Sequence, residues 1–217
     1  SYLRLKNAGA VFPAEVEERL RKSIDFCAWV AFPDGRLPMI GDSDDSSAYV
    51  PVRYWRDLER PDVGYIVTAG QDGTMPAAAS RAWPDGGWYV MRSPWGSRPF
   101  AQDLHMVFKA SPGGGHGHLD QLSLTAYAFG RPLLIDPGRL NYRQDGARDF
   151  ACTAVHNTIV VDHVSQHRGP AKVAKWLVAP AYDFVDASHR LYPGVVHRRR
   201  VLFVKDVFWL VVDTLAS

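Results

Sequence analysis

Hydrophobic residues recur at helical spacing near the N-terminus of the chain. Pro13 suits a first helical turn, and acidic residues follow it where the helix dipole favours negative charge. Apolar residues then lie three or four positions apart at Val16, Leu20, Ile24, Cys27 and Val30. Pro33-Asp34-Gly35 ends this pattern. We therefore predict one amphipathic helix over residues 13–31, whose apolar stripe needs partners that we expect to be largely absent from this chain.

From about Tyr65 onward, apolar and polar residues alternate, as they do in half-buried strands. Before that point a short helix is expected over residues 51–62, and Lys205-Asp206 is expected at the tip of a long hairpin. The expected strands are Trp88–Arg92, Leu104–Lys109, Leu122–Phe129, Leu133–Asp136, Thr158–Asp162, Lys175–Ala179, Tyr182–Ala187, Val195–Lys205 and Val207–Thr214. Many short strands in series predict a mainly β fold, an antiparallel β-sandwich preceded by a short α-helical segment.

The composition agrees with a globular protein and excludes few functions. The 217 residues are 47% hydrophobic and 22% charged, and the net charge of +2 gives no argument for nucleic acid binding. No run of about 18 apolar residues predicts a membrane span. Arg198-Arg199-Arg200 lies in an alternating segment and is expected to form a solvated face, or else to meet an acidic polymer. Because the chain starts at Ser1 without Met and its last strand runs almost to Ser217, we expect an excerpt from a longer protein.

The candidate chemistry gathers around glycines in the segment GGGHGHLDQ, residues 113–121. His116 and His118 are two positions apart, so both side chains would point the same way in an extended segment. Asp136 ends an apolar segment, where a carboxylate is costly unless it is paired or bound to a cation. His156 precedes another apolar segment. Two kinds of ligand, imidazole and carboxylate, suit a zinc ion, and hydrogen-bonded loop residues without a metal are the alternative.

The motifs in this region resemble a known family. The run GGGHGHLDQLSLTAYAFGRPLLIDPG, followed by AVHNTIVVD, is similar to the C-terminal β-sandwich domain of the heparinase II/III family of polysaccharide lyases. This similarity covers roughly residues 100–165, and LPMIGDSDD upstream resembles the segment that joins the family's helical toroid to its sandwich. The resemblance implies that residues 1–50 are the end of an (α/α) toroid domain and a linker. Residues 51–217 would be the antiparallel sandwich, possibly truncated.

The resemblance also implies roles for individual residues. His118, Asp136 and His156 would be the three ligands of one Zn²⁺ ion, which the family is considered to use for structure. His116, the first histidine of the HGH motif, would face the substrate as a catalytic or carboxylate-neutralising residue. The metal ligands would thus tie the sandwich loops together near the active cleft.

Other residues near the motif have two interpretations each. Tyr142 and Arg148 follow the DPG motif in a loop that tends to carry substrate contacts in the family, and a packed tyrosine and a structural salt bridge are the alternatives. Asp120 is expected to hydrogen-bond loop backbone or to orient a histidine. Trp88 is expected to pack in the sheets, with sugar stacking as the alternative.

The function that the resemblance implies is β-elimination on a uronic-acid-containing polysaccharide, such as a glycosaminoglycan or alginate. The upstream toroid of the same protein would supply the remaining catalytic residues, so this piece alone is expected to have little or no activity. The resemblance also implies a periplasmic or secreted bacterial protein, with no nucleic acid or membrane partner. A non-catalytic carbohydrate-binding sandwich and a zinc-dependent hydrolase are the alternatives.

Overall fold

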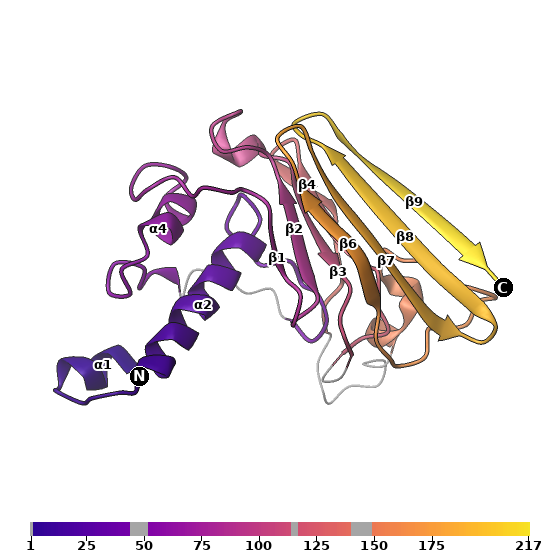
Figure 1. Ribbon diagram of the computed structural model, residues 1–217, viewed down its shortest axis with the longest axis horizontal. Coiled ribbons are helices and arrows are strands. Elements are labelled where there is room, and N and C mark those ends of the chain that lie inside the picture. The colour runs from indigo at the N-terminus through magenta and orange to yellow at the C-terminus, as the bar shows by residue number, and fades with distance from the viewer. Residues whose placement is uncertain (1, 44–51, 114–116, 140–148) are drawn as a thin grey trace.

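A computed structural model describes residues 2–43, 52–113, 117–139 and 149–217 of the chain. Three helices form an arm beside a two-layered β-sandwich (Figure 1). They are α1 (Tyr2–Asn7), α2 (Ala14–Val30) and α4 (Pro61–Val67). Helix α2 confirms the helix predicted over residues 13–31, and no helix in the described part of the chain is long and apolar enough to cross a membrane.

The two sheets are antiparallel throughout, which confirms the predicted sandwich. The first has the order β1-β2-β3-β4-β5, with bounds Arg81–Trp83, Trp88–Arg92, His105–Lys109, Leu124–Ala128 and Arg131–Leu134. The second has the order β6-β7-β8-β9, with bounds Lys172–Val178, Tyr182–Tyr192, Val195–Val204 and Phe208–Ala216. Short 3-10 helices occur at η1 (Phe100–Gln102), η2 (Asp149–Ala151) and η3 (Thr153–Val155). A turn at Lys205-Asp206 joins β8 to β9 as expected.

The main core lies between the two sheets. Met106 and Phe108 of β3 pack in one cluster with Val185 of β7 and with Val201 and Phe203 of β8. These side chains alternate along each strand with residues that face outward, because successive residues of a strand point to opposite faces of the sheet. The alternation read from the sequence therefore placed these residues on the buried face.

The apolar stripe of α2 is covered within the chain, so the expectation that its partners are largely absent is wrong. Trp29 of α2 packs in one buried cluster with Trp55 and with Val63 of α4. Val30, at the end of the helix, joins a second cluster with Val90 and other residues of the first sheet. The division into residues 1–50 and 51–217 stays a prediction, and side chains from both parts share these two clusters.

The strand predicted over Thr158–Asp162 is also wrong. Only an isolated bridge between Val161 and Val164 forms there. Asp162 and His163 both have positive φ values, 50° and 60°, which turn the chain out of an extended conformation. The carbonyl of Ile159 accepts a hydrogen bond from the Tyr192 hydroxyl at 2.7 Å. Side chains therefore satisfy this backbone in place of a neighbouring strand. The helix expected over residues 51–62 is also largely wrong, because residues 53–59 form turns and α4 begins only at Pro61.

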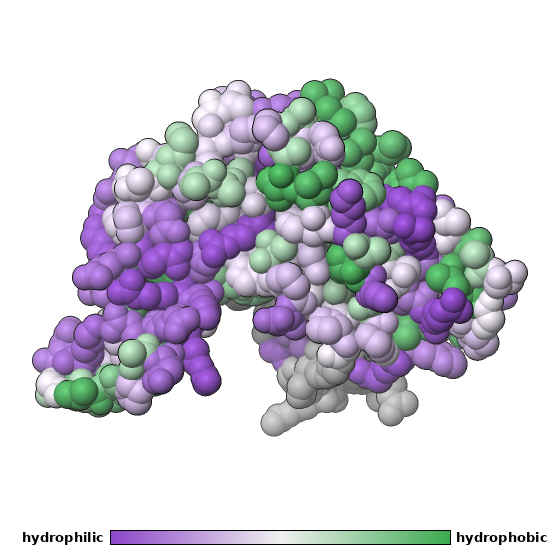
Figure 2. All heavy atoms as spheres, viewed as in Figure 1, coloured by the Kyte–Doolittle hydropathy of each residue, from purple (hydrophilic) through white to green (hydrophobic). Residues whose placement is uncertain are grey.

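The outermost strands β5 and β9 expose apolar side chains. Leu133 of β5 is 50% exposed, and Leu210 and Leu215 of β9 are 49% and 50% exposed. Hydrophobic side chains also gather over the upper end of the sandwich, where β9 begins (Figure 2). Each sheet thus ends in a strand that is only partly covered.

Candidate metal centre and its surroundings

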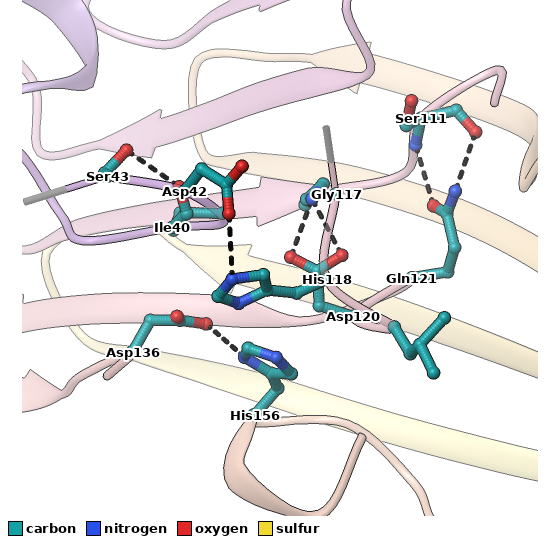
Figure 3. A network of polar contacts seen from close by, with 12 residues as sticks. Ile40, Asp42, Ser43, Ser111, Gly117, His118, Asp120, Gln121, Asp136 and His156 are labelled. Carbon is teal, nitrogen blue, oxygen red and sulfur yellow. Dashed lines mark hydrogen bonds and ion pairs between the residues drawn. The ribbon is translucent and has the colours of Figure 1, made fainter. Parts of the chain in front are cut away.

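His118, Asp136 and His156 come together from three separate loops. His118 lies between β3 and β4, Asp136 follows β5, and His156 follows η3. One ligand atom from each residue lies within 4.8 Å of the other two. Figure 3 shows the three side chains gathered in one place. The structure therefore brings together the three residues that the sequence proposed as metal ligands, and their metal-binding role stays a prediction.

Each imidazole in this cluster has one nitrogen bound to a carboxylate. Nδ1 of His156 donates to Oδ2 of Asp136 at 2.8 Å, and both side chains are fully buried. Nε2 of His118 lies 3.3 Å from Oδ1 of Asp42 (Figure 3). The backbone N–H of Gly138 donates to Asp136 Oδ1 at 3.2 Å, which also helps to fix that carboxylate. These contacts orient the two rings and leave the opposite nitrogen of each free.

The remaining imidazole nitrogens are the clearest sign of a ligand. His118 Nδ1 and His156 Nε2 are buried, and neither has a hydrogen-bond partner in the described part of the chain. Leaving a buried acceptor unsatisfied costs about 1–3 kcal/mol. Burial, followed by the nearby His156, lowers the pKa of His118 and favours the neutral ring that metals bind. Histidine that binds a metal commonly donates its other N–H to a carboxylate, so the donor set fits a zinc ion.

Asp42 is a site residue that the sequence reasoning missed. It lies in the LPMIGDSDD segment, which resembles the segment that joins the family's toroid to its sandwich. The backbone N–H of Arg139 donates to the Ser43 carbonyl at 3.2 Å, so this segment lies against the loop that carries Asp136. Gly138 permits this approach, since a Cβ at that position would lie 2.5 Å from the Ser43 carbonyl oxygen. The conspicuous aspartates of the segment were the available signal.

A buried arginine supports the loop of His156. Nη1 of Arg199, on β8, donates to the carbonyls of Asn157 at 2.6 Å and Leu122 at 2.7 Å. Its Nε and Nη2 donate to the two carboxylate oxygens of Asp213 at 2.8 and 2.9 Å. His197 Nε2 also donates to Asp213, at 2.7 Å. The second sheet therefore holds the residue next to His156 and the chain just before β4.

This arrangement corrects the expected solvated face of Arg198-Arg199-Arg200. Arg199 is only 5% exposed because alternation turns its side chain inward. Arg198 points outward and forms an ion pair with Asp186, and Arg200 Nε lies 3.6 Å from the same carboxylate. Only the two outer arginines of the run therefore lie on the outward-facing side.

Asp120 also differs from its expected role. Its buried side chain accepts two hydrogen bonds from Lys109 Nζ, at 2.7 and 2.6 Å. It therefore forms an ion pair instead of binding loop backbone or a histidine. Even so, Asp120 acts on His118 through its charge, which opposes the lowering of that histidine's pKa.

Two buried glutamines fix the chain that follows the HGH motif. Gln121 and Gln166 exchange hydrogen bonds, with Gln121 N–H donating to Gln166 Oε1 at 2.9 Å and Gln166 Nε2 donating to the Gln121 carbonyl at 3.0 Å. The Gln121 side chain also accepts from the Ser111 N–H at 2.9 Å (Figure 3). It donates to the Gly169 carbonyl at 2.9 Å. These bonds hold both flanks of the glycine-rich segment.

The other candidate site residues cannot be placed. His116, Tyr142 and Arg148 lie outside the described residues. Their catalytic and substrate-binding roles stay predictions that the resemblance implies.

Comparison with known proteins gives a consistent result. Residues 75–217 match the model of the family described as heparinase II/III-like, C-terminal. The chain is 27% identical over 213 residues to a heparin-sulfate lyase of Pedobacter heparinus, covering 93% of this chain and 32% of the relative. It is 25% identical over 217 residues to a heparin-sulfate lyase of Bacteroides stercoris, covering 95% and 32%.

Solved structures resemble the fold closely. A heparinase III gene product superposes with a TM-score of 0.86 at 26% identity, over 95% of this chain and 33% of that one. The heparan sulfate lyase of Pedobacter heparinus superposes with a TM-score of 0.75 at 27% identity, over 85% and 30%. The chain thus spans about a third of the length of these relatives. With its matching motifs and fold, this chain belongs to the heparinase II/III-like family.

Proposed function

We propose that the full-length protein is a polysaccharide lyase that cleaves acidic, uronate-containing polysaccharide by β-elimination. Family membership supports this proposal, as do two relatives that are named heparin-sulfate lyases. The observation that carries it is the buried cluster of His118, Asp136 and His156 directly beside the position of His116 in the chain. A sulfated glycosaminoglycan is the favoured substrate, and alginate or another acidic exopolysaccharide is the alternative.

The chemistry requires three tasks. A base removes the proton from C5 of the uronate, and the electron pair forms a double bond between C4 and C5. The bond from C4 to the bridging oxygen breaks as this double bond forms, and an acid protonates the departing oxygen. A donor or cation beside the uronate carboxylate stabilises the charge that develops there. We assign His116 either to the stabilisation of the uronate carboxylate or to the transfer of a proton, because an imidazole titrates near neutral pH. Residues of an upstream toroid would share the other tasks.

The proposed metal has a structural task in this scheme. Bound by His118, Asp136 and His156, a zinc ion would cross-link three loops of the sandwich and so set the position of His116, two residues from His118. The two unsatisfied imidazole nitrogens support this assignment. A catalytic histidine on a glycine-rich segment benefits from such an anchor, because glycine leaves the backbone many alternative conformations.

The test is an assay of the full-length protein on heparan sulfate and on alginate. We expect the ultraviolet absorbance of the new double bond to increase, and His116→Ala to abolish that increase while metal content and folding stay unchanged. Saturated products that disappear on chelation would instead indicate a zinc-dependent hydrolase. Binding without turnover would indicate a carbohydrate-binding module.

We also propose a periplasmic or secreted location, which the family resemblance suggests. An acidic polysaccharide is a large extracellular polymer, so the protein that cleaves it needs access to that compartment. Fractionation of cells that make the full-length protein tests this proposal, and recovery only in the cytoplasmic fraction would contradict it.

A further inference from the structure

A groove runs from the loop of His118 to the helical arm. One pocket, of about 300 Å³, is lined by His118, Lys109 and Arg168 together with Trp88 and Gly86. A second pocket, of about 630 Å³, lies between α2 and the β1–β2 hairpin and shares Trp88 and Gly86 with the first. Figure 2 shows the molecule hollowed between the arm and the sandwich. Because the two pockets share lining residues, they can bind successive sugars of one chain, and their volumes are typical of ligand sites.

Trp88 stands where the two pockets meet. Its ring contacts Phe26 of α2 edge to face, with centroids 5.4 Å apart and planes at 79°. A Cβ on Gly86 would lie 3.0 Å from the Trp88 ring, so the hairpin backbone passes close to the indole. These contacts fix the ring while leaving part of it accessible. A fixed, partly exposed indole offers an apolar surface on which the C–H face of a sugar can pack.

Arg168 supplies a charge to the first pocket. Its side chain is exposed, and Nη1 donates to the Gly117 carbonyl at 3.1 Å. No carboxylate in the described part of the chain pairs with it. The other cations of the groove differ in this respect, because Lys109 is paired with Asp120 and Arg81 with Asp25. Arg168 therefore keeps guanidinium N–H groups that can bind a ligand. It holds them beside Gly117, the residue that precedes His118.

We infer that this groove is a subsite for the anionic sugars that flank the cleaved bond. Trp88 packs on a sugar ring, and Arg168 binds the sulfate or carboxylate of a neighbouring sugar. A guanidinium matches either anion because its planar fork can donate two parallel hydrogen bonds. The inference rests on the proposed function, since it takes the ligand to be the acidic polysaccharide. It adds residues that bind the polymer to those that cleave it.

The test compares variants of the full-length protein on heparan sulfate oligosaccharides. Arg168→Ala is expected to raise KM about tenfold, the loss of roughly one charge-assisted hydrogen bond, with little change in kcat. Arg168→Lys should recover part of this loss. Trp88→Leu should also raise KM, and its melting temperature shows whether the variant is folded. Arg131→Ala is the control, because Arg131 is an exposed arginine of β5 that does not line the groove. Oligosaccharides stripped of sulfate show whether sulfate or carboxylate is bound.

The outcomes separate the two proposals. If the wild-type protein cleaves the oligosaccharide but Arg168→Ala behaves like Arg131→Ala, the subsite is overturned and the lyase function stands. If no acidic polysaccharide is cleaved, calorimetric binding of the same oligosaccharide decides the subsite by itself. Weaker binding by Arg168→Ala than by Arg131→Ala would support the subsite, and equal or absent binding would overturn it.

Discussion

At the scale of single residues, the histidine cluster is defined by nitrogens without partners. His118 Nδ1 and His156 Nε2 are buried without a hydrogen bond to any residue that the structure describes, while the opposite nitrogen of each ring lies against a carboxylate. Both rings can therefore present a lone pair without losing their orientation. A cation there would compensate two unsatisfied groups at once, so metal and stability should be linked.

Replacing His118 tests that link. Purified wild-type protein should contain about one zinc ion per chain, and His118→Ala should lose it and melt about 5 °C lower or more. Elemental analysis and thermal unfolding measure the two effects. His163→Asn is the control, because His163 is exposed and asparagine tolerates its φ of 60°. If the wild-type protein contains no metal and is no more stable than His118→Ala, the metal proposal is wrong.

Arg199 should matter for stability in spite of its place in a basic run. Arg199→Met leaves the carbonyls of Leu122 and Asn157 without a donor and Asp213 without its main partner. We expect a loss of about 3 kcal/mol in the free energy of unfolding, measured with urea. Arg198→Met on the same strand is the matched control, and it should cost much less, because the Arg198 side chain is 44% exposed and Arg200 stays beside Asp186. Equal losses in the free energy of unfolding for the two variants would show that the buried hydrogen bonds of Arg199 add no extra stability.

These residues also show what the sequence could predict of the site. The grouping of His118, Asp136 and His156 follows from the motifs, because the family resemblance implies one shared role for all three. Strand alternation alone could have turned Arg199 inward. Its partners were not predictable, since Asn157 and Leu122 lie 42 and 77 positions away in the chain. Asp42 approaches His118 only because the joining segment folds back over the sandwich.

At the scale of elements, one histidine joins the helical arm to the sandwich. His105 of β3 donates from Nε2 to the carbonyl of Trp29, near the end of α2, at 2.8 Å. Its other nitrogen, Nδ1, is buried without a partner in the described part of the chain. Burial, followed by the charge of Arg92, lowers the pKa of His105 to about 3. Protonation of His105 at Nδ1 would place a charge between the arm and the sandwich. No described residue would accept a hydrogen bond from the new N–H.

Two buried histidines, His105 and His189, predict that the free energy of unfolding depends on pH. Burial, followed by nearby His197 and Arg199, also lowers the pKa of His189 of β7, to about 4. Unfolded histidine takes up a proton near pH 6.5, so both groups stabilise the fold above that pH. This contribution is lost as pH falls toward about 4 for His189 and about 3 for His105. Urea unfolding at about pH 7.5 and 4.5 should show the decrease.

His105→Gln is the diagnostic variant, because glutamine keeps a donor for the Trp29 carbonyl but does not titrate. Its stability should fall less between the two pH values than that of the wild-type protein. An unchanged difference would mean that other groups cause the pH dependence. His163→Asn, which alters an exposed histidine, should leave the difference unchanged.

At the scale of the whole molecule, alternation predicted eight of the nine strands that the described residues form, and so the sandwich, because the side chains that face the other sheet recur at every second position. The three-residue strand β1 is too short to show a pattern. The region between β5 and β6 could not be predicted in the same way. There the Asn157 side chain donates to the Ile135 carbonyl and the Tyr192 hydroxyl donates to the Ile159 carbonyl, and such contacts leave no periodic signal in the sequence.

The division of the proposed active site predicts the behaviour of the isolated chain. This piece should yield little or no unsaturated product from heparan sulfate, because we propose that the partner residues would lie on an upstream toroid. The full-length protein assayed side by side provides the reference rate. Matching rates for the two would show that the sandwich and its arm suffice for catalysis.

The partly covered strands at the sheet edges have a practical consequence for work with this piece. An edge strand offers unpaired backbone groups as a template, and apolar side chains beside them favour pairing with another molecule. Solutions of the isolated chain should therefore scatter more light per unit mass as concentration rises. Leu210→Lys places a charge on β9 and should reduce this self-association, whereas the same change at the exposed Val11 of the arm should not. Edge charge, more than overall charge, would then set how concentrated a usable sample can be.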